Sequence, residues 1–232
     1  MPTNSDLIQH LEQFATEKRR ELFYKLIGYR TRYVTVVLED IYQSQNASAV
    51  LRTCDCLGIQ DVHIIENQNK YQINPDVALG ANKWLSIKKY NQKNHNNTLT
   101  AIKALKDNGY RIVATTPHTN NTELPDFNLQ PGKTAMLFGT EKKGLSPTAL
   151  SLSDEFVKIP LYGFTESYNI SVSAAIILYQ LTEKLKTTSP KIEWQLSTAE
   201  QAEILLEWFS ASIRNSKGII NKYLTEINGR PQ

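Results

Sequence analysis

Three short polar stretches follow apolar, strand-like runs, and they carry the side chains best suited to chemistry. The first contains Asn46 and Arg52, the second contains Glu141, and the third contains Ser167 and Asn169. Amides and hydroxyls orient substrates by hydrogen bonding, a guanidinium holds anions with a planar fork of donors, and a carboxylate can fix either group. Each residue alone also has a structural explanation, as a helix cap or a solvated charge. Taken together, the stretches predict a site assembled from three loops.

The third stretch, IPLYGFTESYNISVSAAIILYQL (159–181), has the most informative pattern. It begins as the end of an apolar strand, continues as a glycine-containing polar loop and ends as a strongly apolar helix. In open α/β sheets, ligands bind at such a transition, because the loop backbone and the helix N-terminus offer free hydrogen-bonding groups. Four small polar residues crowd the predicted helix start: Ser167, Asn169, Ser171 and Ser173. A single helix cap requires fewer, so the pattern favours a ligand site.

Several familiar kinds of site are excluded. The loop after the first predicted strand, LEDIYQSQN, contains no glycine, which argues against a dinucleotide-binding fingerprint. The stretch GTEKKGLS (139–146) resembles a phosphate-binding loop, but Leu145 occupies the position of the required lysine. Cys54 and Cys56 lie two residues apart in a helical pattern and therefore point to different faces. The four histidines are scattered, so we expect no metal site.

The elements that position these residues alternate along the chain. We expect strands at residues 33–38, 62–65, 85–87, 111–115, 134–138 and 156–159, and helices at 5–27, 47–57, 97–108, 171–186 and 198–216. Asn46 is expected to cap the second helix, which Gly58 ends, and Ser146 with Pro147 to begin another. The alternation predicts an α/β fold with a mostly parallel, six-stranded sheet covered by helices on both faces.

Composition is that of an ordinary globular protein, with 41% hydrophobic and 21% charged residues among 232. No apolar run approaches the length of a membrane span, and the first residues lack the hydrophobic core of a signal peptide. We therefore expect a cytoplasmic protein without a membrane partner. The last residues, INGRPQ, are expected to be loose.

Positive charge is concentrated near the N-terminus. Residues 17–32 contain six Lys or Arg and two Glu, although the net charge of the whole chain is only +3. Such a run is commonly a solvated helix face. Tyr24 and Tyr29 lie among the cations, and aromatic rings interleaved with positive charges also suit a nucleic acid. The candidate RNA-binding residues are Lys18, Arg19, Arg20 and Arg30.

In order and spacing, the three stretches closely resemble the TrmH family of the SPOUT superfamily of RNA methyltransferases. The matching motifs are NASAVLRT (46–53), FGTEKKGLS (138–146) and the stretch from Ile159 to Ala174. GANKW (80–84) and the basic N-terminal helix are similar to the corresponding segments of the tRNA-methylating branch of this family. Leu161 replaces the usual Met and Tyr168 the usual Leu, but no presumed catalytic residue is lost.

The resemblance implies a 2′-O-methyltransferase that uses S-adenosylmethionine, with a trefoil knot at the C-terminal end of the sheet. By position, the cofactor would contact Thr115, Leu137, Gly139, Ile159, Leu161 and Tyr168. Arg52 would orient the ribose and phosphate of the substrate, and Asn46 and Asn169 would hold the hydroxyl or the guanidinium. Ser167 would assist, and Glu141 would fix the geometry. The substrate would be guanosine 18 in the D-loop of tRNA; ribosomal RNA, or a catalytically silent RNA-binding protein of the same fold, is the alternative.

The resemblance also implies three regions: a basic helical extension at 1–32, the methyltransferase domain at 33–186 and a helical extension at 187–232. It further implies a homodimer whose active sites combine residues of both subunits. The predicted helix 171–186 supports this partly, because it is apolar around much of its circumference. The C-terminal segment with Trp208 is the alternative cover for that helix.

Overall fold

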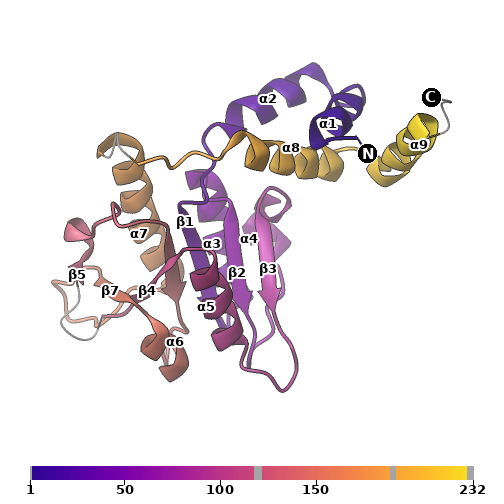
Figure 1. The fold of residues 1–232 in the computed structure, drawn as a ribbon. Coiled ribbons are helices and arrows are strands. Elements are labelled where there is room, and N and C mark those ends of the chain that lie inside the picture. Colours follow the sequence, from indigo (N-terminus) through magenta and orange to yellow (C-terminus); the bar gives the residue numbers. More distant parts are fainter. Residues whose placement is uncertain (1, 118–121, 189–191, 229–232) are drawn as a thin grey trace. The chain divides into compact units, whose positions relative to one another are not determined.

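The computed structural model describes residues 2–117, 122–188 and 192–228, and the chain divides into two compact units (Figure 1). The larger unit, Thr31–Trp194, contains the sheet. The smaller unit combines both ends of the chain, Met1–Arg30 and Gln195–Gln232. Among the described residues, no helix has the length and apolar character that a membrane crossing requires.

A seven-stranded, wholly parallel sheet forms the centre of the larger unit, in the order β3-β2-β1-β6-β4-β7-β5. The strands are β1 (Val34–Glu39), β2 (Asp61–Ile65), β3 (Ser86–Tyr90), β4 (Arg111–Thr115), β5 (Thr122–Glu123), β6 (Thr134–Phe138) and β7 (Glu155–Lys158). The parallel α/β architecture predicted from the sequence is confirmed. Parallel pairing brings the carboxyl ends of the strands to one edge of the sheet, where the polar loops follow.

The predicted count of six strands is wrong, because the sheet also includes β5. This strand consists of two exposed polar residues that pair with the end of β7, where Thr122 faces Val157 and Glu123 faces Lys158. Two residues without hydrophobic alternation give no strand signal, so the sequence pattern could not predict this strand.

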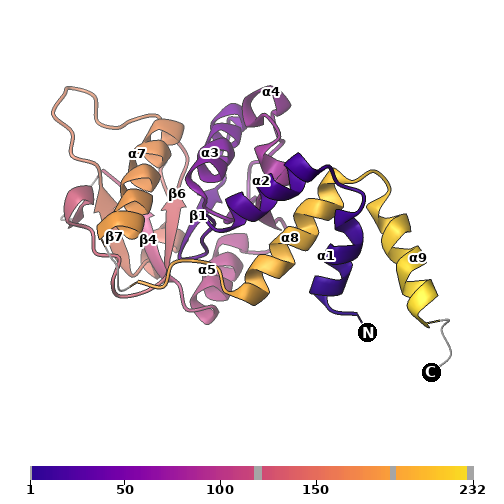
Figure 2. The same cartoon turned by 90° about the horizontal axis from the view of Figure 1, so that it is seen from above.

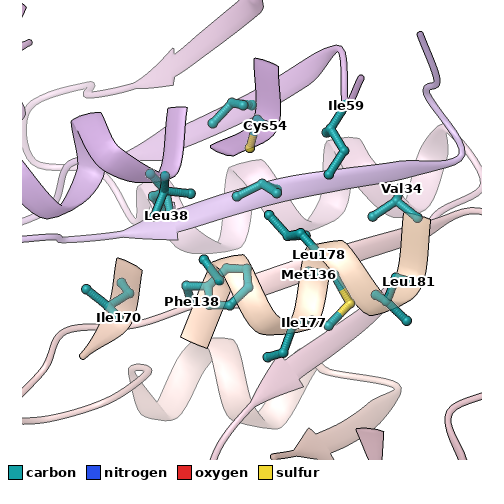
Figure 3. Packing of buried hydrophobic residues seen from close by; sticks show 14 of the residues in the cluster. Val34, Leu38, Cys54, Ile59, Met136, Phe138, Ile170, Ile177, Leu178 and Leu181 are labelled. Carbon is teal, nitrogen blue, oxygen red and sulfur yellow. The ribbon is translucent and has the colours of Figure 1, made fainter. Parts of the chain in front are cut away.

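Helices cover both faces of the sheet, as expected. Val34, Val36 and Leu38 of β1 pack with α3 (Ser44–Leu57) and α7 (Ile170–Glu183) on one face (Figure 3). Val37 of the same strand packs on the opposite face with α5 (Asn97–Asp107) and α6 (Pro147–Leu152). Figure 2 shows α3 and α7 on one side of the strands and α5 on the other. The strands are therefore buried from both sides, as in other parallel sheets.

Helix boundaries near the polar loops follow local capping chemistry. Ser146 accepts a hydrogen bond from the Ala149 N–H and Pro147 begins α6, as predicted. Gly58 ends α3 in the left-handed conformation, with φ +81°. Asn46, however, is not the cap of α3, because the helix begins at Ser44 after Gln43. Short segments complete the unit: α4 (Pro75–Ala78), η1 (Ala81–Lys83), η2 (Leu124–Asp126) and the π-helical η3 (Lys184–Thr188).

The smaller unit is helical and consists of α1 (Asn4–Glu12), α2 (Glu17–Ile27), α8 (Thr198–Ser212) and α9 (Ser216–Asn228). α8 packs against both α1 and α2, and α9 packs against α1. Phe23 of α2 contacts the rings of Trp208 and Phe209 on α8, with ring centroids 5.5 and 5.1 Å apart. The two extensions predicted at opposite ends of the chain therefore share one aromatic core.

The single helix predicted over 5–27 is wrong, because the chain breaks between α1 and α2. Thr16 adopts an extended conformation and begins the second helix. Phe14 lies in the break and is 52% exposed. The tail was expected to be loose from Ile227, but α9 continues to Asn228; the last four residues lie outside the described part of the chain.

Candidate active site

A cavity of about 360 Å³ lies at the carboxyl ends of β4, β6 and β7. Its walls are the start of the chain after β4, the β6–α6 loop (139–146) and the β7–α7 loop (159–169). Its volume falls within the range of roughly 300–1,000 Å³ that is typical of small-molecule sites. The predicted position of the site, at the edge where parallel strands end, is the position of this cavity.

A close backbone approach shapes the β6–α6 loop. Thr140 and Gly144 exchange two backbone hydrogen bonds of 2.9 Å, and Gly144 has φ +67°. A Cβ added to Gly139 would lie 2.2 Å from the backbone carbon of Gly144, so only glycine fits there. The loop thus folds back on itself and presents backbone groups to the cavity.

A buried carboxylate anchors the far end of this loop. Glu39, at the end of β1, is 2% exposed and accepts hydrogen bonds from the Ser146 N–H at 2.8 Å and the Ser146 hydroxyl at 2.7 Å. It also accepts a hydrogen bond from the hydroxyl of Thr98 on α5. Glu39 therefore joins β1, α5 and the start of α6. Glu39 was not predictable from the sequence, because an acidic residue at a strand end resembles an ordinary loop residue.

Most of the predicted cofactor-binding residues line the cavity. Thr115, Gly139, Ile159, Leu161 and Tyr168 all contribute to its walls. Leu137 does not contribute, because its side chain is fully buried in the sheet and its carbonyl oxygen accepts the Thr115 hydroxyl at 2.7 Å. Glu141 and Ser167, predicted as catalytic residues, also line the cavity and are exposed.

Residues from the three sequence motifs meet beside the cavity in one hydrogen-bonded cluster. Asn46 donates to Glu141, and Asn169 donates to Glu141 at 3.1 Å and to the side-chain oxygen of Asn46 at 3.3 Å. Asn169 also caps α7, because its side-chain oxygen accepts the Ser171 N–H at 2.8 Å. We call Asn46, Glu141 and Asn169 the amide–carboxylate cluster. Glu141 and Asn169 lie 95 and 123 residues from Asn46 along the chain. The packing of α3 on α7 brings the two asparagines together, and the β6–α6 loop contributes Glu141.

Arg52 lies apart from the cavity within this chain. It is exposed and borders a groove formed by α3, α4 and α7, together with Thr53, Cys56, Val77, Ile176 and Tyr179 among others. The groove is mostly apolar, and Tyr179 in it is 59% exposed. Arg52 is the sixth residue after Asn46, and on a helix this spacing turns the two side chains to different faces. The structure therefore gathers Asn46 with Glu141 and Asn169, but it does not bring Arg52 to them.

The basic residues predicted to bind RNA fall into two groups. Lys18 and Arg19 on α2 are exposed, and Arg20 is partly exposed. Arg30 is only 4% exposed, and its guanidinium lies over the Trp208 ring, 5.0 Å from the centroid. Its position corrects the expectation that Arg30 is a surface contact, because a side chain packed on a ring in the core of the smaller unit is not presented to a phosphate.

Four charged residues of the cavity have no distinguishing signal in the sequence: Lys142, Lys143, Lys158 and Glu166. None of the four is a position on which the resemblance to the family depends. Charged residues in loops are normally solvated, so nothing in the sequence distinguished them. Among the described residues, no group of three or more His, Cys, Asp or Glu is arranged to hold a metal ion. Cys54 is buried and Cys56 is exposed, in agreement with their predicted opposite faces.

Comparison with known proteins identifies relatives across most of the chain. The model of the SpoU rRNA methylase family matches residues 33–179. The chain is 43% identical over 211 residues to a tRNA (guanosine(18)-2′-O)-methyltransferase of Borreliella burgdorferi, and the match covers 91% of this chain and 93% of that relative.

Solved structures of the same kind share the fold. The chain resembles the A. aeolicus TrmH/SpoU tRNA modifying enzyme with a TM-score of 0.74 and 27% identity, covering 85% of this chain and 98% of that one. It also resembles the SpoU methyltransferase AviRb from Streptomyces viridochromogenes, solved in complex with the cofactor AdoMet. In that case the TM-score is 0.58 and the identity 22%, over 70% of this chain and 64% of that one.

Proposed function

Because the chain belongs to the SpoU methylase family, we propose that it methylates the 2′-hydroxyl of guanosine 18 in tRNA. The observation that carries this assignment is the 43% identity to a tRNA (guanosine(18)-2′-O)-methyltransferase over nearly the full length of both proteins. Ribosomal RNA is a less suitable substrate for this chain, because the full-length similarity is to a tRNA-modifying enzyme. A catalytically silent protein is disfavoured by the presence of Asn46, Arg52, Glu141 and Asn169.

S-adenosylmethionine is the proposed cofactor, and the cavity has the properties that it requires. Backbone groups of two folded loops, the hydroxyl-bearing Thr115 and Thr140, and apolar side chains such as Ile159 and Leu161 line a space of about 360 Å³. Apolar walls with a few polar groups suit a nucleoside. The tight approach of Gly139 to Gly144 leaves the loop backbone accessible at the wall. Support also comes from the AviRb structure, which contains this cofactor.

The catalytic contribution of the chain would be mostly alignment. When bound, S-adenosylmethionine supplies a methyl group that is already activated on a sulfonium, so the protein must orient the ribose hydroxyl and accommodate its proton. Arg52 suits the orienting role, because a guanidinium grips phosphate with several fixed donors but remains protonated and is a poor base. The amide–carboxylate cluster would position the ribose beside the cavity, with Ser167 assisting from the cavity wall.

We also propose that the protein acts as a homodimer with shared active sites. Arg52 borders an apolar groove on α3, α4 and α7, away from the cavity that holds Glu141 and Ser167. Trp208 packs against Phe23 in the smaller unit, whereas Tyr179 and Val172 of α7 remain 59% and 44% exposed. A second copy seated in the groove would cover these apolar side chains and carry its Arg52 to the first copy's cluster.

Two finer structural proposals follow from the family. The chain after β7 would pass through a loop to form a trefoil knot; in support, β4 separates β6 from β7 in the sheet, and Asn169 returns to the start of α3. A crystal structure without that threading would contradict the knot. The extensions 1–32 and 187–232 would flank the methyltransferase domain 33–186, and the first would serve tRNA binding, supported by the exposed Lys18 and Arg19.

The proposed activity is tested by incubating the protein with labelled S-adenosylmethionine and a tRNA transcript, then mapping the methylated nucleotide by mass spectrometry. The expected product is a single 2′-O-methylguanosine at position 18, the position in the name of the B. burgdorferi relative. The matched control is the same tRNA with 2′-deoxyguanosine at that position, which lacks the accepting hydroxyl. Methylation of ribosomal RNA alone, or binding of tRNA without methyl transfer, would reject the assignment.

A further inference from the structure

Two aromatic side chains on the β7–α7 loop are almost entirely solvent-exposed. Tyr162 is 96% exposed and Phe164 is 109% exposed relative to a free reference residue, the two largest values among the large hydrophobic residues described. The loop runs outward from the sheet before it returns to α7 (Figure 2). Gly163 separates the two rings, and a Cβ there would meet only the Thr165 nitrogen at 4.0 Å. The rings therefore project into solvent without a partner in the described chain.

The same loop forms part of the cavity wall. Leu161 precedes the aromatic pair and lines the cavity, as do Glu166, Ser167 and Tyr168 after it. Tyr162 and Phe164 thus stand on the outer part of a loop whose inner part faces the proposed cofactor. A substrate bound at the cavity would therefore lie next to this loop.

Two exposed lysines stand at the same opening. Lys142 and Lys143 line the cavity from the β6–α6 loop. Glu141 and Glu166 lie in the same lining, and Lys158 at the end of β7 forms an ion pair with Glu123 at 3.8 Å. Cations beside exposed rings are the combination that single-stranded nucleic acid prefers, because lysines attract the phosphates while rings stack on the bases. Sequence-specific RNA recognition also favours unpaired bases in loops, which can be splayed onto aromatic side chains.

We propose that Tyr162 and Phe164 form a stacking platform for unpaired bases of the substrate RNA, next to the nucleotide whose ribose enters the cavity. This inference rests on the proposed RNA substrate and adds which residues of the chain would contact its bases. A second protein copy is a poorer occupant, because the apolar groove that would receive it is lined by α3, α4 and α7 and contains no residue of the 159–169 loop. The cofactor is also a poorer occupant, since Leu161 and Tyr168, and not the two exposed rings, face its cavity.

The test compares Phe164→Leu and Tyr162→Leu with Phe164→Trp and Tyr162→Phe. The leucine variants keep an apolar side chain but lose the ring, whereas the other two keep a ring. The probe is a substrate tRNA carrying 2-aminopurine beside the methylated nucleotide, because stacking on a protein ring changes the fluorescence of this base. We expect the leucine variants to lose the fluorescence change and to raise the KM for tRNA roughly tenfold, while the ring-preserving variants stay near wild type.

The affinity for S-adenosylmethionine and the oligomeric state serve as controls, and both should be unchanged in all four variants. Lower cofactor affinity in Phe164→Leu would make the loop a cofactor lid, and a change of oligomeric state would make it a subunit contact; either result overturns the proposal. Equal tRNA KM values in leucine and ring-preserving variants would also overturn it. Failure of the wild-type protein to methylate any RNA would instead reject the proposed function, so the two failures are distinguishable.

Discussion

Glu141 determines the orientation of both asparagines in the amide–carboxylate cluster. A carboxylate offers only acceptors, so Asn46 and Asn169 must each turn the amide nitrogen toward it. With its nitrogen turned toward Glu141, Asn169 directs its side-chain oxygen to the Ser171 N–H at 2.8 Å and so caps α7. In the same way, Asn46 directs its side-chain oxygen to the Asn169 nitrogen at 3.3 Å. A single exposed glutamate therefore controls the positions of two amides on two helices.

Substitutions of Glu141 should have graded effects. Glu141→Gln keeps a carbonyl acceptor for both amide nitrogens, whereas Glu141→Ala leaves them without one. Since hydrogen bonds to charged groups contribute roughly 1.5–3 kcal/mol, we expect kcat to fall roughly tenfold in Glu141→Gln and hundredfold in Glu141→Ala. Steady-state kinetics with tRNA and a separate measurement of cofactor affinity provide the test. Wild-type turnover in Glu141→Ala would show that the cluster has no catalytic role.

At the scale of elements, the β6–α6 loop depends on the absence of a side chain at Gly139. A Cβ at this position would lie within 2.3 Å of three backbone atoms of Gly144 and Leu145. Backbone atoms cannot rotate away as a flexible side chain can, so Gly139→Ala should force the loop open at a cost of roughly 1–3 kcal/mol. The loop forms one wall of the cavity. The free energy of cofactor binding should therefore decrease by at least as much as the free energy of unfolding.

Gly163→Ala is the matched control for Gly139→Ala, because it adds the same methyl group to the other cavity loop, where the nearest atom is 4.0 Å away. Calorimetric titration with S-adenosylmethionine and thermal melts should separate the two variants clearly. Wild-type cofactor binding by Gly139→Ala would indicate that the loop does not contribute to the cofactor site.

The paired strands β2 and β3 contain a histidine that should make stability depend on pH. Burial, and secondarily the charge of Lys88, lower the pKa of His63 from 6.5 to about 4. The ring nitrogen lies 3.1 Å from the Tyr90 hydroxyl. Between pH 6.5 and 4 the unfolded chain binds a proton that the folded chain does not, so the free energy of unfolding should fall by about 2–3 kcal/mol as the pH decreases through this window. Urea titrations of His63→Gln should lack this part of the pH dependence; identical profiles for variant and wild type would contradict the assignment.

Strongly periodic strands were predictable from the sequence, but helix starts near the site were only partly so. The run YVTVVL indicated a strand buried from both sides, and β1 is buried at every position. Asn46 carried the expected signal of a helix cap, yet α3 begins at Ser44, and Asn46 instead donates hydrogen bonds to Gln43 and Glu141. Capping propensity is a local preference, and a tertiary partner 95 residues away outweighs it.

At the scale of the whole molecule, tRNA binding should depend on the charge of α2. Replacing Lys18, Arg19 and Arg20 with Gln removes three exposed or partly exposed cations. Since each phosphate contact contributes a slope of roughly 0.9 in a plot of log affinity against log salt, the triple variant should bind more weakly and with a shallower slope. Arg30→Gln is the control: its side chain is buried against Trp208, so it should lower the melting temperature without changing the slope. An unchanged slope in the triple variant would indicate that these residues form a solvated helix face and do not contact RNA.

Long-range assembly is what the sequence could not specify. The sequence predicts one helix over 5–27, but α1 and α2 are separate elements. Phe23 is buried in the core that α8 completes, whereas Phe14 is exposed. Arg30 belonged to a basic run in sequence, but the same core buries it. Motif order predicted which residues form the site, whereas the separation of Arg52 from the amide–carboxylate cluster depends on the packing of α3, α4 and α7.

That separation leads to the strongest prediction for the assembled protein. If the site is shared, each subunit contributes Arg52 to one active site and Asn169 to the other. The two test variants are Arg52→Ala and Asn169→Ser, and serine is chosen at position 169 because its side chain can still cap α7. Each variant alone should be inactive. A mixed dimer would carry both lesions in one site and none in the other, so an equal mixture should recover about a quarter of wild-type turnover, because random pairing makes half the dimers mixed.

The amide–carboxylate cluster supplies the matched control for this experiment. Glu141 and Asn169 are hydrogen-bonded within one chain, so their lesions belong to the same site. A mixture of Glu141→Ala with Asn169→Ser should therefore remain at the activity of the separate variants, because every site in a mixed dimer carries one lesion. Subunit exchange is verified with two differently tagged chains before turnover is measured. Recovery in the first mixture but not in the second identifies Arg52 as the residue donated across the interface. No recovery in the first mixture despite complete exchange, or full activity in a monomer by light scattering, would confine the active site to a single chain.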